Sequence, residues 1–160
     1  MVEFILKKFT KSISIIPFLL STLSGVLVFL FLYPVRILNP HFYSWLHGDP
    51  ALHFIGFNFF NTEPWQWPPG IIKNLSFPEL TSIVYTDSIP LVSSILKVFS
   101  IHDIYQFHGI WILICFILQG AIGFLFFSSV LPNKWSCLIG SFFLVTMPTF
   151  LRRGFESTCH

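Results

Sequence analysis

Charged residues are scarce in this sequence. They make up 10% of its 160 residues, whereas a soluble domain usually carries about 25%. Hydrophobic residues make up 54%, including 21 phenylalanines, and the mean hydropathy is +0.74. This composition excludes an ordinary soluble domain and predicts a membrane protein with the lipid bilayer as its partner. The net charge of +2 is too small and too scattered to predict nucleic-acid binding.

Cysteines and recognisable motifs are also few. The three cysteines, Cys115, Cys137 and Cys159, lie far apart, and two of them sit in apolar runs. No disulfide framework or cysteine metal site follows from such spacing. The sequence holds no internal repeat, no low-complexity tract and no glycine-rich nucleotide-binding motif. It therefore offers no sign of nucleotide chemistry.

Three apolar runs are predicted to form transmembrane helices, near residues 13–33, 108–131 and 135–151. A bilayer core needs about 20 consecutive apolar residues, which the first two runs supply. The third is shorter and is interrupted by Pro148. Gly25 in the first run and Gln119 in the second predict faces that contact another helix.

The lysines predict how these runs are oriented. Lys7, Lys8 and Lys11 precede the first run, and positive charge is enriched on the cytoplasmic side of membrane helices. The N-terminus is therefore predicted to be cytoplasmic, with an uncleaved first helix. Residues 34–107 then form a large extracytoplasmic loop, and Lys134 lies in a cytoplasmic turn.

The external loop contains a predicted helix start at Gly48-Asp49-Pro50. The Asp49 carboxylate can accept from free backbone N–H groups, and proline suits the first helical position. Pro64 is expected to end this helix. Asp49 and His53 then lie one turn apart on one face, a weak two-ligand candidate for a divalent cation. Two interpretations of Asp49 stay open here: a helix cap or a functional acid.

The loop is predicted to contain short amphipathic helices near the membrane surface. The first carries an apolar stripe formed by Leu52, Ile55 and Phe59. A second apolar run, residues 89–101, is too short to span a bilayer and contains Lys97, so an interfacial or re-entrant helix fits it. Ser88 or Asp87 is expected to cap that helix.

The third run is predicted to deliver Arg152 and Arg153 to the outer side, against the positive-inside trend. Either this segment does not fully cross the membrane, or the two arginines are placed to bind head groups or phosphates. The chain also reads as the N-terminal part of a longer polytopic protein, so further transmembrane helices or partner subunits are expected. Residues 1–160 are predicted to form a single membrane domain.

These features resemble the GT-C superfamily of membrane glycosyltransferases, which use polyprenyl-phosphate-linked sugar donors. The matching points are Gly48-Asp49-Pro50, Pro64-Trp65-Gln66-Trp67-Pro68, and Ile89-Pro90-Leu91 to Lys97. Residues 48–53, 82–91 and 106–119 are also similar to an uncharacterised bacterial family of polytopic membrane proteins, a domain of unknown function. The fold class implied is an all-α, GT-C-like integral membrane protein.

The resemblance implies sugar transfer on the outer face of the bacterial inner (plasma) membrane. Asp49 would act as the base on an acceptor hydroxyl, or would hold a divalent cation. Arg152 and Arg153 would stabilise the leaving lipid phosphate, and His53 and Asp87 are expected to contact the substrate. The alternatives are a non-catalytic component of envelope polysaccharide assembly or export, and an inactive fragment of a larger protein.

Overall fold

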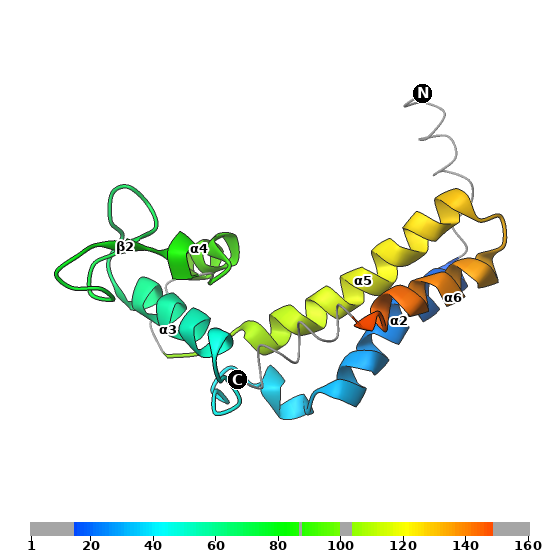
Figure 1. Cartoon of the computed structure of the whole chain (residues 1–160), viewed down its shortest axis with the longest axis horizontal. Helices are drawn as coiled ribbons and strands as arrows, with labels where there is room; N and C mark the ends of the chain where they lie inside the picture. The colour runs from blue at the N-terminus through cyan, green and yellow to red at the C-terminus, as the bar shows by residue number, and fades with distance from the viewer. Residues whose placement is uncertain (1–14, 87, 100–103, 149–160) are drawn as a thin grey trace, which may run out of the picture. The chain divides into compact units, whose positions relative to one another are not determined.

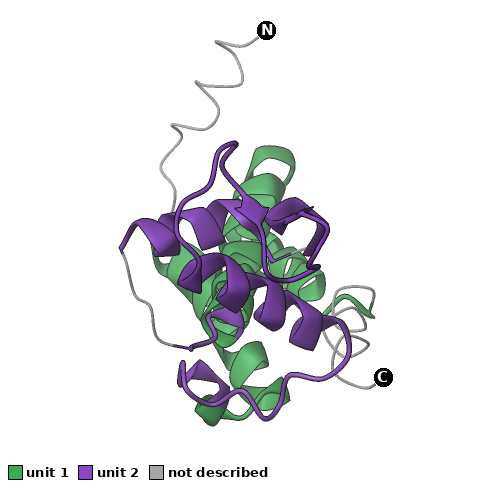
Figure 2. Ribbon diagram, turned by 90° about the vertical axis from the view of Figure 1, so that its left-hand side faces the viewer, with its two compact units in different colours: residues 1–36, 109–153 green, residues 37–108, 154–160 purple. Residues whose placement is uncertain are grey.

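The computed structural model describes residues 15–86, 88–99 and 104–148, which are mostly helical, as predicted (Figure 1). The elements in chain order are α2 (Ile15–Leu32), η1 (Val35–Leu38), α3 (Asp49–Thr62), β1 (Ile71–Ile72), β2 (Thr81–Ser82), η2 (Ile83–Thr86), α4 (Pro90–Val98), α5 (His108–Val130) and α6 (Lys134–Val145). They fall into two compact units, coloured separately in Figure 2. Unit 1 is Met1–Arg36 with Gly109–Arg153, and unit 2 is Ile37–His108 with Gly154–His160.

Helices α2 and α5 are the two longest helices of unit 1. They contain 18 and 23 residues, which corresponds to about 27 and 35 Å at 1.5 Å per residue. Both are long and apolar enough to cross a membrane, judged by length and composition. Their bounds agree with the first two apolar runs of the sequence.

Small residues bring the helices of unit 1 into close contact. A Cβ atom added to Gly25 would lie 2.2 Å from the Phe116 carbonyl oxygen, and one added to Gly120 would lie 2.3 Å from that of Ser21. The Ser21 hydroxyl donates to the Gly120 carbonyl oxygen at 2.7 Å and lies 2.5 Å from the Ser141 hydroxyl oxygen. Helix pairs in membranes typically pack through such small and hydroxylated residues. The close contact predicted at Gly25 is confirmed.

Helix α6 packs against α2 and α5 but is shorter than predicted. Asn133 caps its start by accepting a hydrogen bond from the Trp135 amide at 3.0 Å. The Gln119 side chain donates to the Leu144 carbonyl oxygen at 3.5 Å, which confirms that the Gln119 face meets another helix.

The third predicted span, 135–151, differs from the structure at its end. Helix α6 stops at Val145 after 12 residues, or about 18 Å. Pro148 supplies the reason, because proline lacks the backbone donor and disfavours helical backbone at the residue before it. Residues 149–151 lie outside the described part of the chain.

Helix α3 anchors unit 2 and begins and ends where its prolines predict. Pro50 lies in its first turn, and Glu63, directly before Pro64, is its C-cap. Its inward side contributes Phe60 to a small core with Ile72 of β1 and Ile83 of η2. The predicted apolar stripe is present but exposed, with the side chains of Leu52, Ile55 and Phe59 on the surface. The antiparallel pair of two-residue strands was not predicted.

Helix α4 begins differently from its prediction. Ile89 occupies the N-cap position with a φ of 51°, and no side chain of the described residues caps the helix. Ser88 is buried and donates instead to the His53 carbonyl oxygen at 2.7 Å. The predicted cap by Ser88 is therefore wrong, since Ser88 is bonded to α3. The other proposed cap, Asp87, lies outside the described residues.

Candidate functional site

Asp49 is the first residue of α3, and its side chain is exposed. Gly48 takes the N-cap position with a φ of 60°, a region that glycine tolerates. Among the described residues, the Asp49 carboxylate has no hydrogen bond or ion pair. The interpretation of Asp49 as the helix cap is therefore wrong: Gly48 holds that position, and Asp49 already has helical backbone. Its negative charge at the helix N-terminus remains favourable.

His53 lies one turn along α3 from Asp49 and contacts a second histidine. Its ring stacks on that of His108 with centroids 6.3 Å apart, and His108 in turn stacks on Phe107 at 4.7 Å. This histidine pair was not predicted, because sequence spacing within α3 shows only the i, i+4 relation between Asp49 and His53. The sequence signal that could have indicated this pair is His108 itself, a polar residue at the first position of an apolar helix.

His108 is buried in an unusual way. Its side chain is 6% exposed, and neither ring nitrogen has a hydrogen-bond partner within the described chain. Buried polar groups almost always have such partners. A neutral imidazole offers one donor and one acceptor, and within the described chain both are left unused at His108.

The cation site predicted at Asp49 and His53 stays a prediction, with these two residues as its protein ligands. In residues 15–86, 88–99 and 104–148, no three His, Cys, Asp or Glu side chains lie close enough together to hold a metal ion. Asp49 and His53 thus gain no third protein ligand there. The other predicted substrate contacts, Asp87, Arg152 and Arg153, lie outside the described residues.

A buried lysine closes the C-terminal end of α3. Lys97 of α4 is 4% exposed, and its ammonium group donates to the Phe60 carbonyl oxygen. It also lies 4.0 Å from the ring centroid of Phe60 and 4.9 Å from that of Trp65. A cation is favoured both at a helix C-terminus and over aromatic rings. Lys97 therefore links the end of α3 to Trp65 in the Trp-Pro segment.

Glu63 is a second buried charged residue near Lys97. Its two carboxylate oxygens accept from the backbone amides of Lys73 and Asn74, each at 2.8 Å. Burial lowers the pKa of Lys97 by disfavouring the charged form, and the Glu63 carboxylate partly opposes this. Both groups are used in holding unit 2 together, so we assign them a structural role.

Replacing Lys97 with methionine should lower the free energy of unfolding by about 1–3 kcal/mol, because the Phe60 carbonyl loses its buried donor. The pH dependence supplies a second signature. The unfolded chain binds the lysine proton more tightly than the folded chain, so wild-type stability should rise as pH climbs from the lowered pKa toward 10.5. Lys97→Met should lack this rise. Tryptophan fluorescence during thermal unfolding measures both effects.

The matched control is Lys73→Met, which removes an exposed lysine from the same unit. It should leave both the unfolding midpoint and its pH dependence unchanged. Equal losses in the two variants would contradict the role assigned to Lys97.

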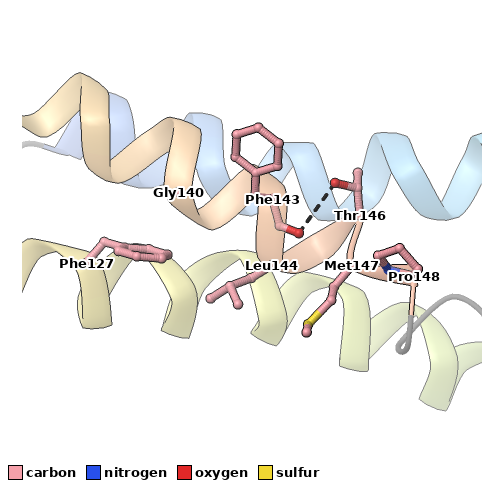
Figure 3. A pocket seen from close by; sticks show the side chains of 7 residues that line it. All are labelled: Phe127, Gly140, Phe143, Leu144, Thr146, Met147 and Pro148. Atoms are coloured by element: carbon pink, nitrogen blue, oxygen red, sulfur yellow. Dashed lines mark hydrogen bonds between the residues drawn. The ribbon is translucent and has the colours of Figure 1, made fainter.

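Unit 1 contains an apolar groove of about 430 Å³ along α6 (Figure 3). Its lining residues are Phe127, Gly140, Phe143, Leu144, Thr146, Met147 and Pro148. The one polar side chain among them, Thr146, donates to a carbonyl oxygen of its own helix, that of Phe142, at 2.9 Å. The residues that line the groove therefore supply no acid, base or free polar group.

Comparison with known proteins gives one match. The family model described as "Domain of unknown function (DUF6311)" matches residues 22–159. The searches of curated proteins and of solved structures found no match.

Proposed function

The chain belongs to the DUF6311 family, a domain of unknown function, and from that premise we propose that it is an integral membrane protein. The support is the arrangement of unit 1. Its small and hydroxylated residues face inward, while large apolar side chains such as Leu19, Leu23, Leu27 and Phe31 are exposed. Water disfavours such a surface, and lipid accepts it.

The proposed location is a bacterial inner membrane, with the N-terminus in the cytoplasm and residues 34–107 outside. Lys7, Lys8, Lys11 and Lys134 carry this orientation through the positive-inside trend. Unit 2, with Asp49, then lies on the extracytoplasmic side.

A cysteine at position 76 should report this orientation. Ser76 is exposed in the segment between β1 and β2, so Ser76→Cys places a reactive thiol on the surface of unit 2. In a background without the three native cysteines, a membrane-impermeant maleimide added to intact cells should block this thiol nearly completely. Labelling only after cell lysis would reverse the orientation.

We infer further that the protein transfers a sugar from a polyprenyl-phosphate-linked donor to an acceptor hydroxyl. The observation that carries this proposal is the exposed carboxylate of Asp49 at the start of α3, which has no hydrogen bond or ion pair within the described part of the chain. As the acceptor oxygen bonds to the anomeric carbon, its proton passes to Asp49 and the lipid phosphate leaves with the bonding electrons. A carboxylate within hydrogen-bond reach of the hydroxyl is suited to this step.

The other proposed participants bind the substrate. His53, one turn from Asp49, and Asp87 are proposed to contact sugar or acceptor hydroxyls. Arg152 and Arg153 are proposed to neutralise the leaving phosphate, for which the guanidinium fork is suited. In the alternative role of Asp49, in which it is not the base, a divalent cation held by Asp49 and His53 would supply charge for the same phosphate.

The experiment is a transfer assay with the intact protein in membrane vesicles. A panel of polyprenyl-phosphate sugars, each radiolabelled in the sugar, is offered with an envelope extract as acceptor. At least one donor should give labelled product above vesicles lacking the protein. Absence of product from every donor, together with no cross-linking to a photoactivatable polyprenyl phosphate, would contradict the proposal and favour a non-catalytic role.

A further inference from the structure

Helix α4 has the reverse burial pattern of an ordinary surface helix, with polar side chains buried and apolar ones exposed. Its buried residues are polar, Ser93 and Lys97. Its outward side chains are apolar, with Leu91 74%, Ile95 50% and Val98 68% exposed, and Phe99 directly after the helix is 70% exposed. A helix on a water-facing surface shows the opposite pattern. We call Leu91, Ile95, Val98 and Phe99 the α4 face.

The polar groups of α4 are satisfied without water. Ser93 donates to the Ser88 carbonyl oxygen, Ser94 donates to that of Pro90, and Lys97 donates to that of Phe60. The Phe99 amide closes the helix end by donating to Leu96 and Lys97. The α4 face thus has no polar side chain. This suits contact with hydrocarbon, where unsatisfied polar groups are costly.

Chain connectivity keeps unit 2 close to the two long apolar helices. Unit 2 follows α2, which ends at Leu32, and leads directly into α5, which begins at His108. With α2 and α5 in the membrane, linkers this short keep residues 37–108 at the membrane surface. Helix α4 itself has 9 residues, about 14 Å, and is too short to span.

We propose that the α4 face is a membrane-docking surface that lies in the plane of the bilayer, with its apolar side chains among the lipid acyl chains. Lys97 is turned inward to α3, where it caps the helix, so docking does not bury an unpaired charge. Unit 2 is thereby held at three points, by α2, by α5 and by α4. The inference shares with the proposed function only the placement of α2 and α5 in a bilayer.

The test compares two single-cysteine variants of the intact protein, without native cysteines, in phosphatidylcholine vesicles. Ile95→Cys on the α4 face and Ser76→Cys between the strands are each labelled with a small environment-sensitive fluorophore. Lipids brominated on the acyl chain should lower the fluorescence at position 95 at least twofold, and iodide in the water should have little effect there. Position 76 should show the reverse.

Two other results would overturn the proposal. If iodide quenches position 95 as strongly as position 76, the α4 face is in water. If neither quencher reaches position 95, protein covers the face, from a second copy or another chain. Leu91→Cys, on the same face, repeats the measurement in case Ile95→Cys folds poorly. The readout does not involve sugar transfer, so failure here and failure of the proposed function are distinguishable.

Discussion

Sugar transfer should fall by about 100-fold or more when Asp49 is replaced by asparagine, while the folded yield stays at the wild-type level. The loss is the usual consequence of removing a general base, because the amide cannot accept the acceptor proton. The yield should hold because Gly48, not Asp49, occupies the cap of α3, and the Asp49 side chain is exposed. The measurement is transfer rate and folded yield, side by side, in the same membranes.

Glu79→Gln is the matched control, since Glu79 is another exposed acid of unit 2 and the change removes the same charge. It should leave transfer unchanged. Normal transfer by Asp49→Asn would remove the base from the proposal. Equal losses in the two variants would indicate a general effect of charge rather than a base at position 49.

The ends of the helices could be predicted from the sequence because local chemistry decides them. Pro50 and Pro64 bracket α3, and the apolar runs give the described ends of α2 and α5 to within two residues. The discrepancy at α6 has the same origin: Pro148 already marked the interruption, yet the predicted helix ran through it. Where a helix starts or stops depends mostly on residues within one turn.

Which side of α4 is buried could not be predicted. The apolar stripe of α3 at Leu52, Ile55 and Phe59 was predicted to lie near a membrane surface, and the structure leaves it exposed. On α4, Lys97 looks like a surface charge, and it is buried against the end of α3. Local patterns carry no information on which distant segment covers a face, and the usual rule assumes water on the other side.

The candidate site was predictable only in part, for the same reason. Asp49 and His53 are neighbours through helical spacing, so their relation is local. The stacking of His53 on His108 joins α3 to the start of α5, and no spacing rule reaches across that distance. The predicted cap by Asp49 was wrong by one position. Gly48, with a φ of 60°, is the N-cap, and Asp49 is the first helical residue.

Replacing Gly120 with alanine should lower the free energy of unfolding by about 3 kcal/mol, the upper part of the range for overpacking. The new Cβ would lie 2.3 Å from the Ser21 carbonyl oxygen, and helix backbone has no rotamer by which to move away. Helices α2 and α5 must therefore separate, which also strains the bond from the Ser21 hydroxyl to the Gly120 carbonyl. Thermal unfolding in detergent, with the yield of monodisperse protein, measures the loss.

Gly123→Ala supplies the control, one turn further along α5. Its nearest neighbours would be a methyl carbon of Leu144 at 3.2 Å and the Cβ atom of Ser141 at 3.3 Å, both far less close than the backbone contact at Gly120. Since alanine favours helix over glycine by about 1 kcal/mol, this variant should stay within about 1 kcal/mol of wild type. Gly25→Ala separates the same two helices, so combining it with Gly120→Ala should cost less than the sum of the single losses. Additive losses, or a tolerated Gly120→Ala, would show that α2 and α5 do not pack backbone to backbone.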